Sequence, residues 1–303
     1  MAEVGKILPA VAVLVLLCTV DLLCKGMPSE EIMLYLRLPR MLTALIAAGG
    51  LSVAGAQMQS IFRNPLADPY IMGVSSGAAL GAATVTLLGL NSGISLSLAA
   101  ICGAGISAAI ILVISAKIRE ANTLLTFGIL LAFFTSALIT ILQYTAEATQ
   151  LKSYYLWSAG SFSSADYMAI AIMSTALAAG LWLGISNAKA LDLILFGDEY
   201  TVYAGASPRK IRIKAIMSAC LIAGSVTAFC GPIGFVGIVV PQLVRKIFRS
   251  SSHRRVLPLC LLLGASFGLF ADICSQLWML PVSATMAFVG IPIIIDILLK
   301  PGK

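Results

Sequence analysis

Residues 94–116 read ISLSLAAICGAGISAAIILVISA and contain no charged side chain. About 20 mostly apolar residues are enough for a helix to cross the hydrocarbon core of a bilayer. The run is continuous and does not alternate between apolar and polar positions, which excludes a strand of a membrane β-barrel. This stretch therefore predicts a membrane-spanning helix.

Similar runs follow one another along the chain, so the sequence predicts an all-α polytopic membrane protein with ten transmembrane helices. The expected spans are residues 7–24, 41–60, 70–88, 94–116, 123–144, 167–186, 211–229, 233–248, 256–275 and 282–299. The eighth is short and has a glycine-rich start. We find no linker, internal repeat or low-complexity tract, and therefore expect residues 1–303 to form a single transmembrane domain.

The composition agrees with this interpretation. Of 303 residues, 59% are hydrophobic and 11% are charged, whereas soluble domains carry about 25% charged residues. These values exclude a disordered chain, a nucleic-acid-binding domain and an ordinary soluble enzyme. The seven cysteines lie in or beside apolar runs without the spacing of metal ligands, so we interpret them as packing residues.

The net charge of +7 is explained by orientation in the membrane. With the N-terminus in the cytoplasm, 16 of the 20 Lys and Arg residues lie on the cytoplasmic side, as the positive-inside rule requires. The exceptions are Lys25, Arg37, Arg40 and Lys152. An even number of spans then places both termini in the cytoplasm, and no nucleic acid partner is needed to explain the charge.

Two connections are more than simple loops. Residues 145–166 are amphipathic and aromatic, which is typical of an interfacial half-helix. Residues 187–210 predict two small helices that project from the membrane. Asp198 and Glu199 would favour the start of the second, and Gly205 and Pro208 would end it. Such a segment is either a plain loop at the membrane surface or a docking element that a soluble partner binds through a helix-in-groove contact.

The chain lacks most catalytic motifs. It has no P-loop sequence for ATP, and no cluster of residues has the spacing of metal ligands. Its single histidine, His253, lies in a basic stretch and is expected to be a solvated loop residue. Gly73-Val-Ser75-Ser-Gly77 formally fits the nucleophile elbow of a hydrolase, but it also fits a stripe of small residues that packs helices together.

The few acidic residues inside the spans leave an alternative open. Asp21 and Asp296 lie four residues before Lys25 and Lys300, which is typical of pairs near helix ends. Asp272 lies deeper, where it is either bonded to a neighbouring helix or part of a proton path. The second interpretation would make the chain an ion-coupled secondary transporter.

Five stretches together closely resemble one family. They are Leu36-Arg-Leu-Pro-Arg40, residues 55–78 with their Arg63-Asn-Pro-Leu-Ala-Asp-Pro69 core, residues 197–205, residues 231–245 and Ala271-Asp-Ile273. In order and spacing they resemble the FecCD family, the ten-span permease subunits of bacterial ABC importers for iron–siderophores, haem and cobalamin. The resemblance covers nearly the whole chain.

The resemblance implies a type II ABC importer permease in the bacterial cytoplasmic (inner) membrane. Two permease copies, expected here as a homodimer, would enclose a central pathway for an iron complex, with a ferric siderophore first, then haem or cobalamin. A substrate-binding protein would dock outside. Two ATPase subunits inside would bind ATP and Mg and hydrolyse the ATP, so this chain itself would be no enzyme and hold no cofactor.

The resemblance also assigns residues. It implies cytoplasmic coupling helices within residues 191–208, and the ATPase contacts would be Asp198, Glu199, Tyr200, Ala204 and Gly205. Arg37 and Arg40 would pair with acidic residues of the binding protein. Asn64, Pro65, Leu66, Thr135 and Ser136 would lie near the cytoplasmic gate of the pathway. The family's structural motif corresponds to Gly73, Gly77, Gly231, Pro232 and Pro241.

Three positions depart from the family pattern. Gln242 stands where the family often has histidine, and Gln276 stands where some members have a further arginine facing the binding protein. The tenth span reads Gly290-Ile-Pro-Ile-Ile-Ile-Asp296 and lacks the aromatic residues usual there.

Overall fold

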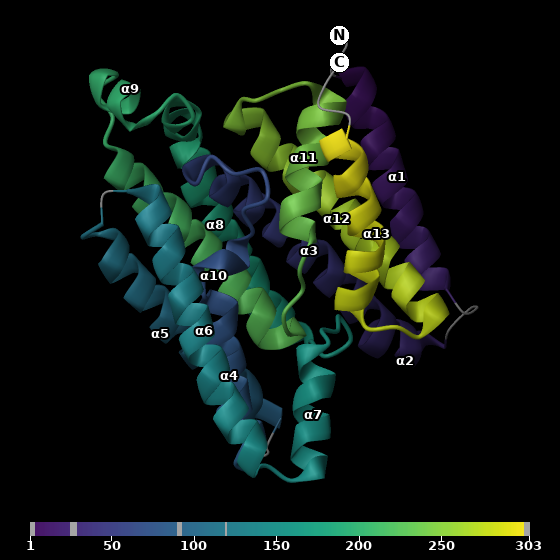
Figure 1. Ribbon diagram of the computed structural model, residues 1–303. Coiled ribbons are helices and arrows are strands. Elements are labelled where there is room, and N and C mark those ends of the chain that lie inside the picture. The colour runs from purple at the N-terminus through teal and green to yellow at the C-terminus, as the bar shows by residue number, and fades with distance from the viewer. Residues whose placement is uncertain (1–3, 25–28, 90–92, 119, 300–303) are drawn as a thin grey trace.

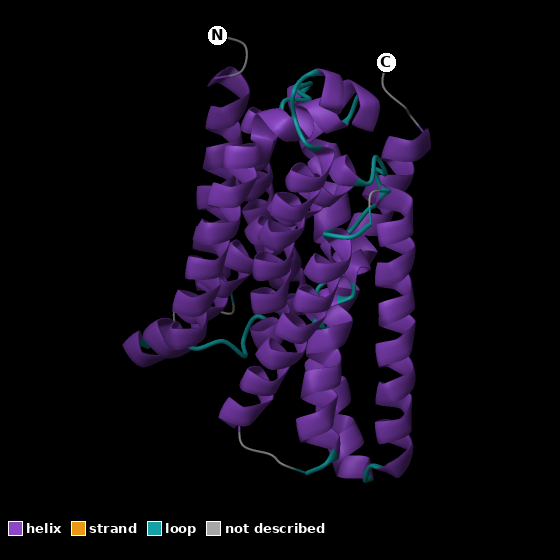
Figure 2. Cartoon of the chain, turned by 90° about the vertical axis from the view of Figure 1, so that its left-hand side faces the viewer, coloured by secondary structure: helices purple, strands orange, loops and turns teal. Residues whose placement is uncertain are grey.

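The computed structural model describes residues 4–24, 29–89, 93–118 and 120–299, and every regular element in these ranges is a helix (Figure 2). The all-α prediction is confirmed for this part of the chain. Seven stretches of helix are long and apolar enough to cross a membrane. These are α1 (Val4–Leu23), the continuous α2 (Glu30–Ile32), η1 (Met33–Arg37) and α3 (Leu38–Ile61), then α5 (Gly93–Ser115), α6 (Ala121–Thr145), α8 (Tyr167–Ile194), α10 (Pro208–Cys230) and α12 (His253–Trp278).

The remaining elements are shorter. They are η2 (Pro69–Met72), α4 (Val74–Leu87), α7 (Ala148–Ser158), α9 (Asp198–Tyr203), α11 (Val236–Phe248) and α13 (Val282–Leu299). Each of the ten expected spans falls on a helix, with α4, α11 and α13 as the three beyond the long seven. Ten membrane crossings therefore stay a prediction. The short helix expected within residues 145–166 is present as α7, and its place at a membrane interface stays a prediction.

The prediction of two small helices in residues 187–210 is wrong in part. α8 continues to Ile194, and only α9 is a separate short helix. The end of α8 is held to the bundle, because Leu191 is buried and Asn187 Nδ2 donates a hydrogen bond of 2.9 Å to the carbonyl oxygen of Ile211. The apolar run that starts at Leu191 therefore extends the sixth span.

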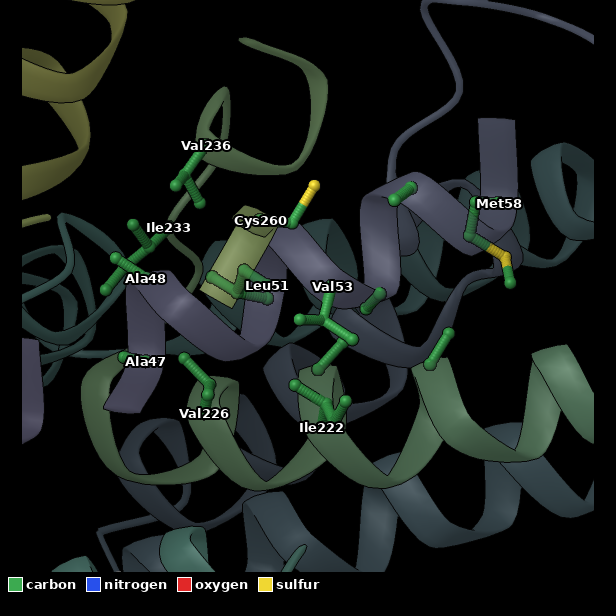
Figure 3. Packing of buried hydrophobic residues seen from close by; sticks show 14 of the residues in the cluster. Ala47, Ala48, Leu51, Val53, Met58, Ile222, Val226, Ile233, Val236 and Cys260 are labelled. Atoms are coloured by element: carbon green, nitrogen blue, oxygen red, sulfur yellow. The ribbon is translucent and has the colours of Figure 1, made fainter. Parts of the chain in front are cut away.

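α3 is the centre of the bundle and packs against α8, α10, α11 and α12. It is built from small residues such as Ala47 and Ala48, which are fully buried, and Figure 3 shows them with Ile222 and Val226 of α10. A Cβ added at Gly268 of α12 would overlap Ala48. Small side chains thus let helix backbones approach closely, as the glycine stripes predicted.

α4 and α5 form a second close pair. A Cβ at Gly77 would overlap Ser107 Oγ, and one at Gly81 would overlap the carbonyl oxygen of Ala99. Ser75 lies in the first turn of α4 and is 8% exposed. The packing interpretation of the Gly73–Gly77 stretch is confirmed.

The two ends of the bundle carry different elements (Figure 1). The start of α1, the end of α13 and α9 lie at one end, called the α9 end below. α2 and α7 lie toward the opposite end, called the α7 end. The polar clusters that bear on function lie at these two ends.

Candidate functional site

α9 is a single helical turn and a half set off from the bundle by glycines. Gly197 precedes it with φ +112° and Gly205 follows it with φ +78°, conformations that residues with a side chain rarely adopt. Pro208 then starts α10, where the missing N–H costs nothing. The sequence therefore forces a short projecting helix between two long ones.

The outer surface of α9 is unusually apolar for an exposed turn. Phe196 is 74% and Tyr203 is 89% exposed, and their neighbours Tyr200 and Val202 are exposed too. Glu199, Ala204 and Gly205 complete this surface. Aromatic residues that stand clear of a protein surface are typical of protein–protein interfaces.

α9 is nevertheless firmly anchored at its base. Asp198 accepts hydrogen bonds from Arg63 Nη2 at 2.6 Å and from Arg212 Nη2 at 2.6 and 2.8 Å. Arg63 Nε also donates to the carbonyl oxygen of Ile194 at 3.1 Å. The buried Thr201 donates to the carbonyl oxygen of Gly197 at 2.6 Å. The ion pairs of Asp198 with Arg63 and Arg212 thus fix α9 to the end of α3 and to α10, and the aromatic surface of α9 is held in place by them.

A groove of about 850 Å³ opens beside this base. It is lined by the end of α3, the start of α6 and one side of α9, with Arg63, Asn122, Asp198, Glu199 and Tyr200 among its residues. The structure therefore brings three of the predicted ATPase contacts to one concave surface at the α9 end.

The connection between α3 and α4 folds back against α11. Asn64 Oδ1 accepts from the Leu66 amide at 2.9 Å, and Gln242 Nε2 of α11 donates to the carbonyl oxygen of Pro65 at 3.2 Å. Asp68 accepts from the Tyr70 amide at 2.9 Å and so caps η2. Burial raises the pKa of the Asp68 carboxyl to about 6.

Gln59 in the last turns of α3 supports this connection. Its Oε1 accepts from Gln242 Nε2 at 2.9 Å and from Arg245 Nη1 at 2.6 Å, and its Nε2 donates to the carbonyl oxygen of Ile238 at 3.1 Å. Gln242, which departs from the family pattern, is therefore a contact between α11 and the predicted gate segment.

The structure does not bring all predicted gate residues together. Thr135 and Ser136 lie about 20 Å along α6 from Ala121, which lines the groove at the α9 end. Thr135 is buried and donates to the carbonyl oxygens of Leu131 and Ala132, whereas Ser136 is exposed. They belong to the middle of the bundle, apart from Asn64, Pro65 and Leu66.

The predicted motif residues shape the backbone at breaks between helices. Gly73 has φ +74° and precedes α4 directly, and Gly231 has φ +73° and packs on the carbonyl oxygen of Trp157. Pro232 follows Gly231 in the break before α11, and Pro241 is buried inside α11.

At the α7 end, Arg40 is bound to the bundle itself. Its Nε donates to both oxygens of Asp272 at 3.1 and 2.9 Å, and its Nη2 donates to Oδ1 at 2.8 Å. Gln276 Nε2 bridges Asp272 and Asp21 at 2.9 Å each. Arg37 Nη1 donates to the carbonyl oxygen of Leu22 at 2.6 Å. The interpretation of Asp272 as a carboxylate bonded to a neighbouring helix is confirmed.

Comparison with known proteins identifies the family. The FecCD transport family matches residues 10–300. The chain belongs to this family. It is 33% identical to the hemin transport system permease protein HmuU of Yersinia pestis, over 89% of this chain and 84% of that protein. It is 32% identical to the vitamin B12 import system permease protein BtuC of Escherichia coli O157:H7, over 96% of this chain and 94% of that protein.

A solved structure agrees with this family assignment. An inward-facing conformation of a metal-chelate type ABC transporter superposes with a TM-score of 0.90 at 27% identity, covering 98% of this chain and 99% of that one. This FecCD protein is thus a multi-pass membrane protein from a family of transport permease subunits.

The prediction for His253 in this FecCD protein is wrong. The residue is fully buried at the start of α12, between Asp192 of α8 and Ser60 of α3. The basic residues around it suggested a solvated loop, but the Ser252-His253 step begins a helix, and its partners are 61 and 193 residues away. Only the capping preference of serine before a long apolar helix hinted at this.

The two acid–lysine pairs of this FecCD protein, Asp21 with Lys25 and Asp296 with Lys300, stay predictions. Lys25 and Lys300 lie outside the described residues. Asp21 is bonded to Gln276, and Asp296 pairs with Lys246 of α11 at 2.8 Å. Within the described residues, no group of three or more His, Cys, Asp or Glu side chains is placed to hold a metal ion.

Proposed function

We propose that the chain is the transmembrane permease subunit of a type II ABC importer and forms the translocation pathway for an iron complex. The observation that carries this proposal is the anchored, aromatic surface of α9 beside its groove. The substrates named for the relatives are hemin, vitamin B12 and a metal chelate. We rank a ferric siderophore first, then haem, then cobalamin.

The ATPase would meet α9 and the groove beside it. Asp198 fixes the helix, Glu199 and Tyr200 line the groove, and Ala204 and Gly205 end the exposed turn. Exposed aromatic residues on a rigid base suit insertion into a cleft of a partner protein. ATP and Mg belong to that partner, which performs the hydrolysis.

The substrate-binding protein would meet the α7 end. Arg37 and Arg40 lie there on one helical stretch, three residues apart, and line one cavity with Asp21 and Gln276. Because Arg40 is shared with Asp272, an acidic side chain of the binding protein would have to compete with Asp272 for its guanidinium.

The remaining features follow from the same proposal. The chain would cross the bacterial cytoplasmic (inner) membrane ten times with both termini and α9 in the cytoplasm. It would pair with a second copy to enclose the pathway. Asn64, Pro65 and Leu66 would form part of the cytoplasmic gate, and Thr135 and Ser136 would line the pathway deeper in the bilayer.

The docking role of α9 is tested by charge reversal. Glu199→Lys is expected to abolish co-purification of the ATPase while the bundle stays folded, since Glu199 is exposed. Glu30→Lys makes the same change at the α7 end and should leave co-purification intact. Equal co-purification of both variants would contradict the docking role.

The substrate is found by identifying the ligand that the cognate binding protein carries when purified from cells.

A further inference from the structure

The last turn of α8 carries an aspartate that is bonded to another helix. Asp192 Oδ1 accepts from the backbone N–H of His253 at 2.8 Å and faces His253 Nδ1 at 2.5 Å, and its Oδ2 accepts from Ser252 Oγ at 3.2 Å. Ser252 makes no side-chain cap bond within its own helix. The carboxylate of α8 therefore caps the N-terminus of α12.

His253 extends this connection to α3. Its Nε2 lies 2.5 Å from Ser60 Oγ, which lies 2.9 Å from the carbonyl oxygen of Ala56 and can give its one proton to either acceptor. His253 is 0% and Ser60 1% exposed, so water does not compete for these bonds. The facing carboxylate assigns a proton to Nδ1. Asp192, Ser252, His253 and Ser60 are called the latch below.

The order Ser–His–Asp is that of a hydrolase triad. A substrate carbonyl would have to reach Ser60 Oγ, yet this residue is 1% exposed in the packed interior of α3. Burial of both the serine and the imidazole excludes this chemistry and favours a mechanical role.

The latch lies between the two parts of the proposed machinery. Asp192 is two residues before Ile194, whose carbonyl oxygen binds Arg63 at the base of α9. Ser60 directly follows Gln59, which holds Gln242 and Arg245 of α11. The direct ion pair between α9 and the residues after α3, Arg63 to Asp198, has side chains 43% and 39% exposed and is therefore weakened by solvent.

We propose that the latch is the rigid joint through which a displacement of α9 reaches α3, α11 and α12. This rests on the proposed function, because the displacement would come from the ATPase docked on α9. His253 and Asp192 are then positioning residues. They contact neither the substrate nor the ATPase, but they determine whether a displacement of α9 is transmitted to α3, α11 and α12.

The joint is tested in proteoliposomes that hold the complete importer with its ATPase and binding protein. Asp192→Asn should keep ATPase co-purification and ATP hydrolysis, while uptake per ATP hydrolysed falls roughly 2- to 30-fold. Ser60→Ala, a milder change, should lower the same ratio by less. Asp166→Asn is the matched control, because Asp166 caps the other end of α8 by accepting from the Ala169 amide. Its ratio should equal that of the unaltered protein.

Three results would overturn the latch. The first is an unchanged uptake-to-ATP ratio in Asp192→Asn. The second is loss of ATPase co-purification in Asp192→Asn, which would make Asp192 part of the docking surface instead. Should Asp192→Asn fail to fold, an unchanged ratio in Ser60→Ala is the third. Failure of the proposed function has a different signature, since the unaltered complex would then show no ATP-dependent uptake at all.

Discussion

Each end of the molecule is built on an aspartate held by arginine, but the two aspartates lie at different depths. At the α9 end, Asp198 is 39% exposed and is shared by Arg63 and Arg212. At the α7 end, Asp272 is 0% exposed and is bound by Arg40 and by Gln276, which also binds Asp21. The aspartate at the α9 end is thus partly open to solvent, whereas the one at the α7 end is buried beside a second buried acid, Asp21.

The ion pairs at the two ends therefore have different roles, although each joins an aspartate to an arginine. Water screens the pair between Arg63 and Asp198, so that pair contributes little stability but can respond to a partner. The buried pair is costly to break, because either partner left alone is a charge without compensation. We therefore expect substitutions at the α7 end to lower the free energy of unfolding most. Substitutions at the α9 end should mainly weaken binding of the ATPase.

The largest effect is expected for Arg40→Ala. It leaves Asp272 and Asp21 facing each other at a buried site, and the expected loss is about 3–5 kcal/mol in free energy of unfolding. The temperature at which buried cysteines such as Cys260 become reactive to a thiol dye reports this unfolding. The double variant Arg40→Met with Asp272→Leu should recover most of the loss. A change below about 1 kcal/mol for Arg40→Ala would contradict the distinction between the two ends.

A smaller effect is expected for Asp198→Ala. Arg212 is only 6% exposed, and the change removes the carboxylate to which its Nη2 donates twice, at an expected cost of about 1–2 kcal/mol. ATPase co-purification should be lost as well, because the base of α9 is released. Glu199→Ala is the neighbouring control, with a stability within about 0.5 kcal/mol of the unaltered protein. Equal stabilities of the two variants would show that Asp198 is no anchor.

The smallest effect on stability is expected for Arg37→Ala. Loss of its hydrogen bond to the carbonyl oxygen of Leu22 is expected to cost about 1 kcal/mol. Capture of the binding protein should nevertheless weaken, and capture by the unaltered protein should fall as salt is added. Capture that resists both Arg37→Glu and high salt would remove the charge-docking proposal.

The sequence predicts the helices well and their partners poorly. Each expected span falls on a helix, because continuous apolar runs report directly on burial in lipid. The bounds of α9 are also predicted locally, because Gly197, Gly205 and Pro208 limit the backbone conformations at its two ends. Asp272 and Arg40 are 232 residues apart, and Ser60 and His253 are 193 apart, so nothing in the local pattern joins them. The basic residues around His253 even suggest the wrong environment.

The most direct test of the account is uptake by the reconstituted protein with its ATPase, its binding protein and the ligand that the binding protein carries. Uptake is measured with ATP and with an imposed ion gradient as separate energy sources. The account predicts uptake that requires ATP and is lost in Glu199→Lys. Uptake by the isolated chain under an ion gradient, with no gain from ATP, would contradict it.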